Sequence, residues 1–188
     1  MADEQIVLEK SSTSDKAILQ GKECVLGKFL SEADGWKIVE TTATWEGTAY
    51  QSVGGRSVKG VGGDCSGITN KSYIEAGFPY PYQRTADFAA YVTASNRFRK
   101  IDPEKVPMQA GDLLLWPGHM AIYAPFPEGH PKRDTGVMHH GKKQINDVYT
   151  AFNDRTNVPY KAYNIATFRP DKYKVYRYLI VQGPETCK

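Results

Sequence analysis

The sequence predicts an α+β domain in which helices come first along the chain and an antiparallel sheet follows. Apolar residues between Ser14 and Trp45 recur at mixed helical spacings, enough for two helices. Beyond residue 110, short segments rich in β-branched and aromatic residues alternate with Pro, Gly and Asn, which is the pattern of strands and turns. The length of 188 residues is that of one domain with a single core.

The limits of the first elements follow from residues that interrupt the apolar pattern. Residues 1–13, which end in Ser-Ser-Thr, are expected to form a flexible arm, and residues 14–188 a single domain. The two helices between residues 14 and 45 are expected to break at Ala33 to Gly35, where Ala-Asp-Gly interrupts the pattern.

A further helix is expected to begin at Cys65, because Asp64 is a good N-cap residue and Gly77 suits the position after the last turn. Another is expected from Ala86 to about Ser95, capped by Thr85. Strands are expected at Asp112 to Trp116, His119 to Ala124, Gly136 to His140, and Lys174 to Val181.

The composition argues against several classes of function. The net charge is only +3, and the basic residues are scattered along the chain, so we expect no nucleic-acid partner. The apolar runs are too short to cross a bilayer. The amino terminus shows no basic segment followed by an apolar stretch, so we expect synthesis in the cytoplasm without a signal peptide. We expect a monomer.

The cysteine and histidine spacings predict neither a disulfide framework nor a metal site. Three cysteines are an odd number at long spacings, which leaves open a bridge between Cys24 and Cys187. The histidines after residue 129 lack the spacing of a zinc site, and the glycines before Asp64 do not form a phosphate-binding loop. We therefore expect no metal and no cofactor.

Cys65 is the candidate nucleophile. A thiol in the first turn of a helix lies at the positive end of the helix dipole, which favours the thiolate. The backbone N–H groups of that turn could also hold an oxyanion while an acyl group is attacked. The alternative is an ordinary buried cysteine, since a free cysteine behaves as a small apolar residue.

His119 is the candidate general base, because it follows a Trp-Pro-Gly turn at the start of a predicted strand. The alternative is a histidine at a surface turn. A third polar group usually orients such an imidazole. His139 and His140, on the next predicted strand, are the candidates, and strand alternation allows only one of them to serve.

Five short sequence blocks resemble the NlpC/P60 family of cell-wall cysteine peptidases in order and in spacing. The resemblance covers about Thr44 to His140; each block alone is a weak signal, and five in order are a strong one. The blocks are Trp45-Glu46-Gly47-Thr48-Ala49-Tyr50, Gly54-Gly55, Asp64-Cys65-Ser66-Gly67, Ala110-Gly111-Asp112-Leu113-Leu114 and Gly118-His119-Met120-Ala121-Ile122-Tyr123.

The resemblance implies a papain-like fold and the hydrolysis of peptidoglycan stem peptides, commonly between γ-D-glutamate and diaminopimelate. By matching position, Cys65 would be the nucleophile, His119 the base and His139 the third residue, with His140 as the alternate. The same chemistry leaves open an N-acetylmuramoyl-L-alanine amidase. A non-catalytic module that binds the wall or a partner is an alternative of another class.

By the same matching, Tyr50 would lie near the scissile carbonyl, and Asp64 and Ser66 would contact the amino end of the substrate. The sequence also departs from the family pattern. An insertion at residues 125–135 lengthens the link after the His119 strand, and Arg84 stands at a shifted position in Tyr80-Pro81-Tyr82-Gln83-Arg84, where the family has Leu-Pro-Arg.

A catalytic domain made without a signal peptide needs another route to the periplasm or cell wall. The chain is similar in this respect to type VI secretion effectors, which imply two further partners, the secretion machinery and an immunity protein. Such an effector would act on the wall of a target cell. A phage lysin is the alternative setting.

Overall fold

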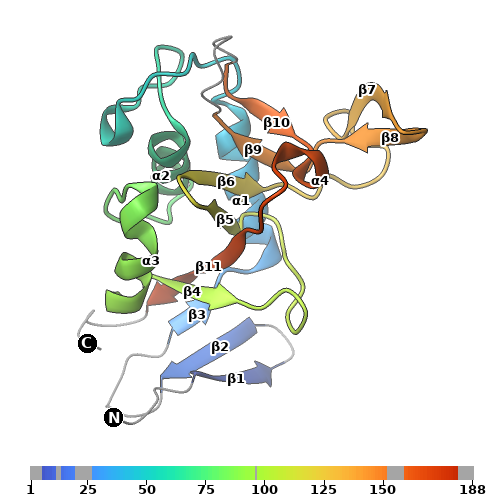
Figure 1. Ribbon diagram of the computed structural model, residues 1–188. Helices are drawn as coiled ribbons and strands as arrows, with labels where there is room; N and C mark the ends of the chain where they lie inside the picture. Colours follow the sequence, from blue (N-terminus) through green and yellow to red (C-terminus); the bar gives the residue numbers. More distant parts are fainter. Residues whose placement is uncertain (1–5, 12–13, 20–26, 96, 152–158, 182–188) are drawn as a thin grey trace.

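An antiparallel sheet of nine strands dominates the computed structural model, which describes residues 6–11, 14–19, 27–95, 97–151 and 159–181 (Figure 1). Its order is β1-β2-β3-β11-β5-β6-β9-β10, and β4 also pairs with β11. β7 and β8 form a separate two-stranded sheet that projects from the body (Figure 1). The strands are β1 (Ile6–Ser11), β2 (Ser14–Leu19), β3 (Gly27–Phe29), β4 (Phe98–Ile101), β5 (Leu113–Trp116), β6 (His119–Tyr123), β7 (Asp134–His139), β8 (Lys142–Ile145), β9 (Val148–Thr150), β10 (Lys161–Tyr163) and β11 (Lys174–Val181).

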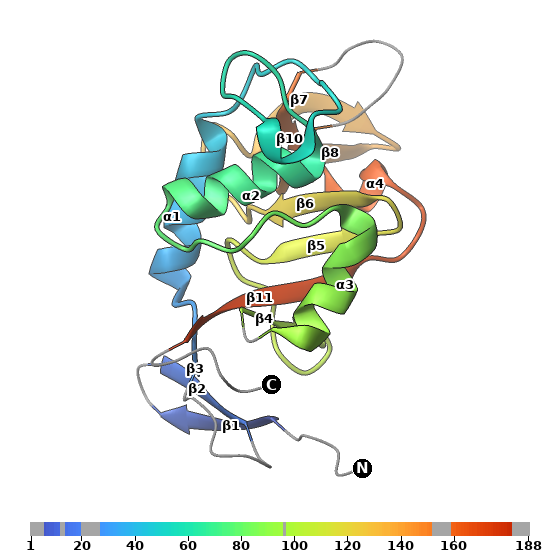
Figure 2. The ribbon, with the colours of Figure 1, turned by 90° about the vertical axis from the view of Figure 1, so that its left-hand side faces the viewer.

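The longer helices α1 (Glu32–Ala43), α2 (Cys65–Glu75) and α3 (Thr85–Ala94) pack on one face of this sheet, and the short α4 (Ile165–Phe168) lies on the other (Figures 1 and 2). Alternation along β5 separates the two cores: Leu113 and Leu115 face the three helices, whereas Leu114 and Trp116 face α4. The predicted α+β class with an antiparallel sheet is confirmed. No helix in the described ranges is long and apolar enough to cross a membrane.

The expected break at Ala33 to Gly35 is wrong, because α1 runs unbroken through it. The helix begins after Ser31, whose side chain accepts a hydrogen bond of 3.1 Å from the N–H of Asp34. Gly35 allows close packing instead of ending the helix: a Cβ at this position would lie 1.8 Å from the carbonyl oxygen of Ala110. Two chain segments can therefore touch backbone to backbone here.

Residues 6–11 and 14–19 form two paired strands, where a flexible arm and the start of a helix were expected. β1 pairs with β2 in register from Ile6 with Leu19 to Ser11 with Ser14. The run Ile6-Val7-Leu8 favours a strand. Residues 1–5 and 12–13 of the predicted arm lie outside the described residues.

The later helices and strands lie close to their predicted positions. α2 begins at Cys65 with Asp64 as its N-cap, and Gly77, with φ of 95°, follows its last turn, as expected. α3 begins one residue early, so Thr85 is its first residue and Arg84 holds the N-cap position without a side-chain cap. The four expected strands correspond to β5, β6, β7 and β11.

A buried ion pair fixes the position of β5 against β11. Arg177 binds Asp112 through two hydrogen bonds, of 2.8 and 2.9 Å, and the two side chains are only 3% and 1% exposed. Asp112 also accepts the N–H of Gln109, and Arg177 donates to the carbonyl of Pro107. Removing one partner of such a pair costs about 3–5 kcal/mol. The aspartate of the Ala-Gly-Asp-Leu-Leu block is thus a structural residue.

Asp147, just before β9, anchors α4. Its Oδ1 accepts a 2.7 Å hydrogen bond from the N–H of Ile165, the first residue of α4, and its own N–H donates to Tyr163. Burial raises the pKa of Asp147 to about 6, although the Ile165 N–H opposes the shift. This anchor holds Phe168 against Trp116, with ring centroids 5.5 Å apart.

Replacing Asp147 with Asn should stabilise the fold at neutral pH while keeping the Oδ1 acceptor. The folded pKa of about 6 lies above the ordinary value of 3.8, so folding favours the protonated carboxyl. Its contribution is present below about pH 4 and is lost as the pH rises through 6. Urea unfolding should show the stability of the wild type, relative to Asp147→Asn, falling by about 2 kcal/mol between pH 4 and 7. The exposed Asp102→Asn serves as the control, and a pH-independent difference for Asp147→Asn would contradict this account.

Candidate active site

The start of α2 is held in place by Asp64, which caps two segments at once. One carboxylate oxygen accepts the N–H of Gly67 at 2.8 Å, and the other accepts the N–H of Gly54 at 2.7 Å. Gly67 permits this approach, because a Cβ there would lie 2.1 Å from the carbonyl oxygen of Gly54. The Asp-Cys-Ser-Gly block therefore fixes Cys65 in the first turn of the helix.

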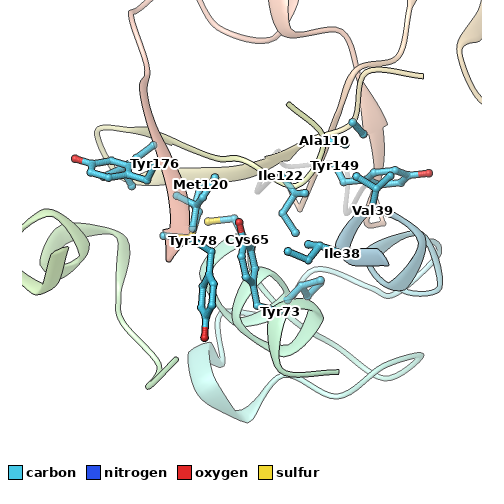
Figure 3. Close-up of a cluster of buried hydrophobic side chains, with 14 of the residues drawn as sticks. Ile38, Val39, Cys65, Tyr73, Ala110, Met120, Ile122, Tyr149, Tyr176 and Tyr178 are labelled. Carbon is cyan, nitrogen blue, oxygen red and sulfur yellow. The ribbon is translucent and has the colours of Figure 1, made fainter. Parts of the chain in front are cut away.

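The sulfur of Cys65 lies beside the peptide group that joins His119 to Met120. Figure 3 shows the sulfur directed toward Met120, and the Met120 backbone N–H lies close enough to lower the pKa of the thiol. Burial raises the pKa of the Cys65 thiol to about 11, against the lowering effect of the N–H groups of Met120 and Ser66. The helix start was expected to favour the thiolate. In this state burial outweighs it, and the thiol is protonated at neutral pH.

His119 is the first residue of β6, directly after the turn at Gly118, whose φ is 71°. Its side chain is 7% exposed, and its ring packs against Phe168 and Trp116 with centroid distances of 4.9 and 5.9 Å. Burial lowers the pKa of His119 to about 4, with a further lowering by Arg169. The imidazole is therefore neutral at pH 7, the form that can accept a proton.

Thr150, the last residue of β9, holds the His119 ring. Its Oγ1 lies 2.8 Å from Nε2 of His119 and donates to the carbonyl oxygen of Met120 at 2.7 Å. The hydroxyl is fully buried. The backbone of Met120 in β6 thus accepts a hydrogen bond from Thr150 of β9 and lies beside Cys65 of α2.

The two histidines predicted as the third residue lie on the separate hairpin. β9, and not β7, is the strand that pairs with β6 on the side away from β5. His140 is exposed in the turn after β7, with φ of 48°. The side chain of His139 lies outside the described part of the structure, so its role stays a prediction.

Tyr50 and Ser66 both lie near the start of α2, because Tyr50 forms a β-bridge with Gly63 and Ser66 follows Cys65. Burial raises the pKa of Tyr50, and so does the charge of Cys65. Ser66 is buried, and its hydroxyl lies 3.3 Å from Asp64 and 3.1 Å from the hydroxyl of Tyr82. Both carboxylate oxygens of Asp64 already accept backbone hydrogen bonds, so its first role is structural.

Sequence reasoning missed Thr150 and Tyr82. Tyr82 packs over Gly54 and its hydroxyl lies beside that of Ser66. Arg84, which stands near the position of the family's arginine, is instead exposed and paired with Asp87 at 2.6 Å. The aromatic-rich segment before Arg84 was a usable signal for Tyr82. Thr150 carried none, because a lone threonine in a short strand resembles any other β-branched residue.

The insertion at residues 125–135 is attached to the body through Phe126 and Lys132. Phe126 is 7% exposed and stacks on His130 at 4.7 Å, and Lys132 forms an ion pair of 2.8 Å with Glu46, next to the end of α1. A cavity of about 720 Å³ lies between this insertion and β8. His130 is thus held by its stacking on Phe126.

Among the described residues, no group of three or more His, Cys, Asp or Glu side chains could hold a metal ion. Cys65 is a free thiol in this part of the chain. Cys24 and Cys187, for which a disulfide bridge was left open, both lie outside the described residues. Comparison of the chain with known protein families, curated proteins and solved structures finds no significant match.

The reactivity of Cys65 should follow a thiol pKa far above the usual range. In a variant with Cys24 and Cys187 replaced by Ser, we expect the rate of alkylation by iodoacetamide to rise about tenfold per pH unit from pH 6 to 9 without levelling, because only the thiolate reacts. Mass spectrometry of the Cys65 peptide measures this rate. A plateau below pH 7 would show a preformed thiolate and imidazolium pair and would contradict the neutral pair described above.

Proposed function

We propose that the protein is a thiol hydrolase of the NlpC/P60 type, with a papain-like arrangement of its α+β fold, that cleaves an amide bond in peptidoglycan stem peptides. The observation that carries the proposal is the meeting of Cys65, at the start of α2, with the peptide group that follows His119. The five ordered sequence blocks support the substrate class. The bond between γ-D-glutamate and diaminopimelate is the proposed target.

The chemistry would proceed by acyl transfer to water. Neutral His119 takes the thiol proton as the Cys65 sulfur attacks the amide carbonyl, and the same proton goes to the leaving amine. The N–H groups at the start of α2 stabilise the oxyanion. A water molecule, deprotonated by His119, then hydrolyses the thioester and restores the thiol.

Burial of both groups fits this order of events. The protonated thiol and the neutral imidazole carry no charge before substrate binds, so neither needs a counter-ion in its own apolar surroundings. Charge develops only as the proton moves. Tyr50 and the hydroxyl pair of Ser66 and Tyr82 line the same end of α2, and we assign to them contact with the substrate.

For the biological setting we propose action in the periplasm or cell wall, with delivery by type VI secretion as an antibacterial effector. In that setting the secretion machinery and an immunity protein would be the partners. A phage lysin would use the same chemistry.

Substitution of the two reacting groups tests the activity. We expect Cys65→Ala and His119→Ala to lower the release of soluble peptides from purified peptidoglycan by at least about 10³-fold, since each removes one half of the proton-transfer pair. His130→Ala is the matched control, because that ring stacks on Phe126 outside the site. Mass spectrometry of the fragments identifies the bond: release of whole stem peptides from the glycan would indicate the amidase. Full activity of Cys65→Ala would refute the proposal.

A further inference from the structure

We propose that Thr150 is a positioning residue that holds His119 as the tautomer with its proton on Nε2 and its lone pair on Nδ1. The inference follows from three atoms: Thr150 Oγ1, Met120 O and His119 Nε2. Its catalytic consequence rests on the proposed function, whereas the tautomer itself does not.

The hydroxyl of Thr150 has one proton to give and lone pairs with which to accept. It lies 2.7 Å from the carbonyl oxygen of Met120, which can only accept. Two oxygens at this distance need a proton between them, because otherwise their lone pairs repel each other. The proton of Thr150 therefore points to Met120, and the carbonyl of Ala151, at 3.3 Å, is a weaker second acceptor for the same proton.

The contact of 2.8 Å to His119 must then run the other way, with Nε2 donating its proton to the threonine oxygen. Burial lowers the pKa of His119 to about 4, so the ring carries one proton at neutral pH. With that proton on Nε2, the lone pair is on Nδ1. Nδ1 is then the ring nitrogen that can accept a proton.

The direction of the backbone N–H and C=O groups of Met120 explains why the Thr150 hydroxyl can donate to this carbonyl. The N–H and C=O of Tyr123 bond to residues 111–112 on the β5 side, so Met120, three residues earlier, directs its own groups to the β9 side. β9 ends at Thr150, which leaves the Met120 carbonyl to the threonine side chain and the Met120 N–H to the Cys65 sulfur. The backbone of Met120 in β6 thus lies next to Cys65 and next to the threonine that orients His119.

A neutral hydroxyl orients the ring without favouring the imidazolium, as a carboxylate would. This agrees with a pair that is uncharged at rest, with a thiol pKa of about 11. Thr150 therefore sets which nitrogen acts, and the surrounding apolar side chains set the charge state.

The tautomer can be measured directly by ¹H–¹⁵N NMR of the wild-type protein at pH 7, with the His119 signals assigned by their loss in His119→Gln. We expect a protonated Nε2 and an unprotonated Nδ1. A protonated Nδ1 would overturn the inference. Because the measurement needs no substrate, it can stand even if the protein proves inactive on peptidoglycan, an outcome that would refute the proposed function alone.

The positioning role is tested with Thr150→Val, which keeps the shape and removes the hydroxyl. We expect kcat on peptidoglycan peptides to fall about 10- to 100-fold with KM within about twofold, and both tautomers to become visible by NMR. Thr150→Ser should restore at least half of the activity. Unchanged kcat in a folded Thr150→Val protein would overturn the role.

Thr69→Val is the matched control. Thr69 is also fully buried, in α2, and its hydroxyl has no hydrogen-bond partner among the described residues, so the same change removes no contact. We expect its kcat and its His119 tautomer to equal those of the wild type. If Thr150→Val fails to fold, Thr150→Ser and the wild-type tautomer still decide the question.

Discussion

The position of the Met120 backbone is the constraint on which the site depends. Its N–H lies close enough to the Cys65 sulfur to lower the pKa of the thiol, and its carbonyl oxygen accepts a hydrogen bond from Thr150. Three elements that are far apart in sequence, α2, β6 and β9, therefore meet at one residue of the sheet. A slip of β6 by one residue would turn every side chain of the strand to the other face. The N–H and C=O groups at this position would then point toward β5.

The rest of the fold keeps β6 in that register. β5 pairs with β6 from Leu113 with Ile122 to Trp116 with His119, and the Asp112 ion pair fixes the entry to β5. Asp64 locks the start of α2 to the glycine loop. The site is thus built on rigid strands and a capped helix, which gives the precision that proton transfer needs.

Sequence reasoning found what local chemistry determines and missed what depends on tertiary contact. The cap at Asp64, the helix start at Cys65 and the strand of His119 follow from short-range patterns, and the structure has them. The predicted helix break at Gly35 was wrong because this glycine serves to let the helix pack closely against Ala110, which is 75 residues away in sequence. The role of Thr150 could not be predicted for the same reason, since only the pairing of β6 with β9 brings this residue to His119.

The most direct test of the account is the covalent intermediate. Acid quenching of a reaction between the protein and a synthetic stem peptide, followed by intact-mass and peptide mapping, should show an acyl group on Cys65. The adduct should be sensitive to hydroxylamine and should have the mass of the amino-terminal product. Hydrolysis in which no adduct accumulates under any quench, or an adduct on another residue, would contradict the central role of Cys65.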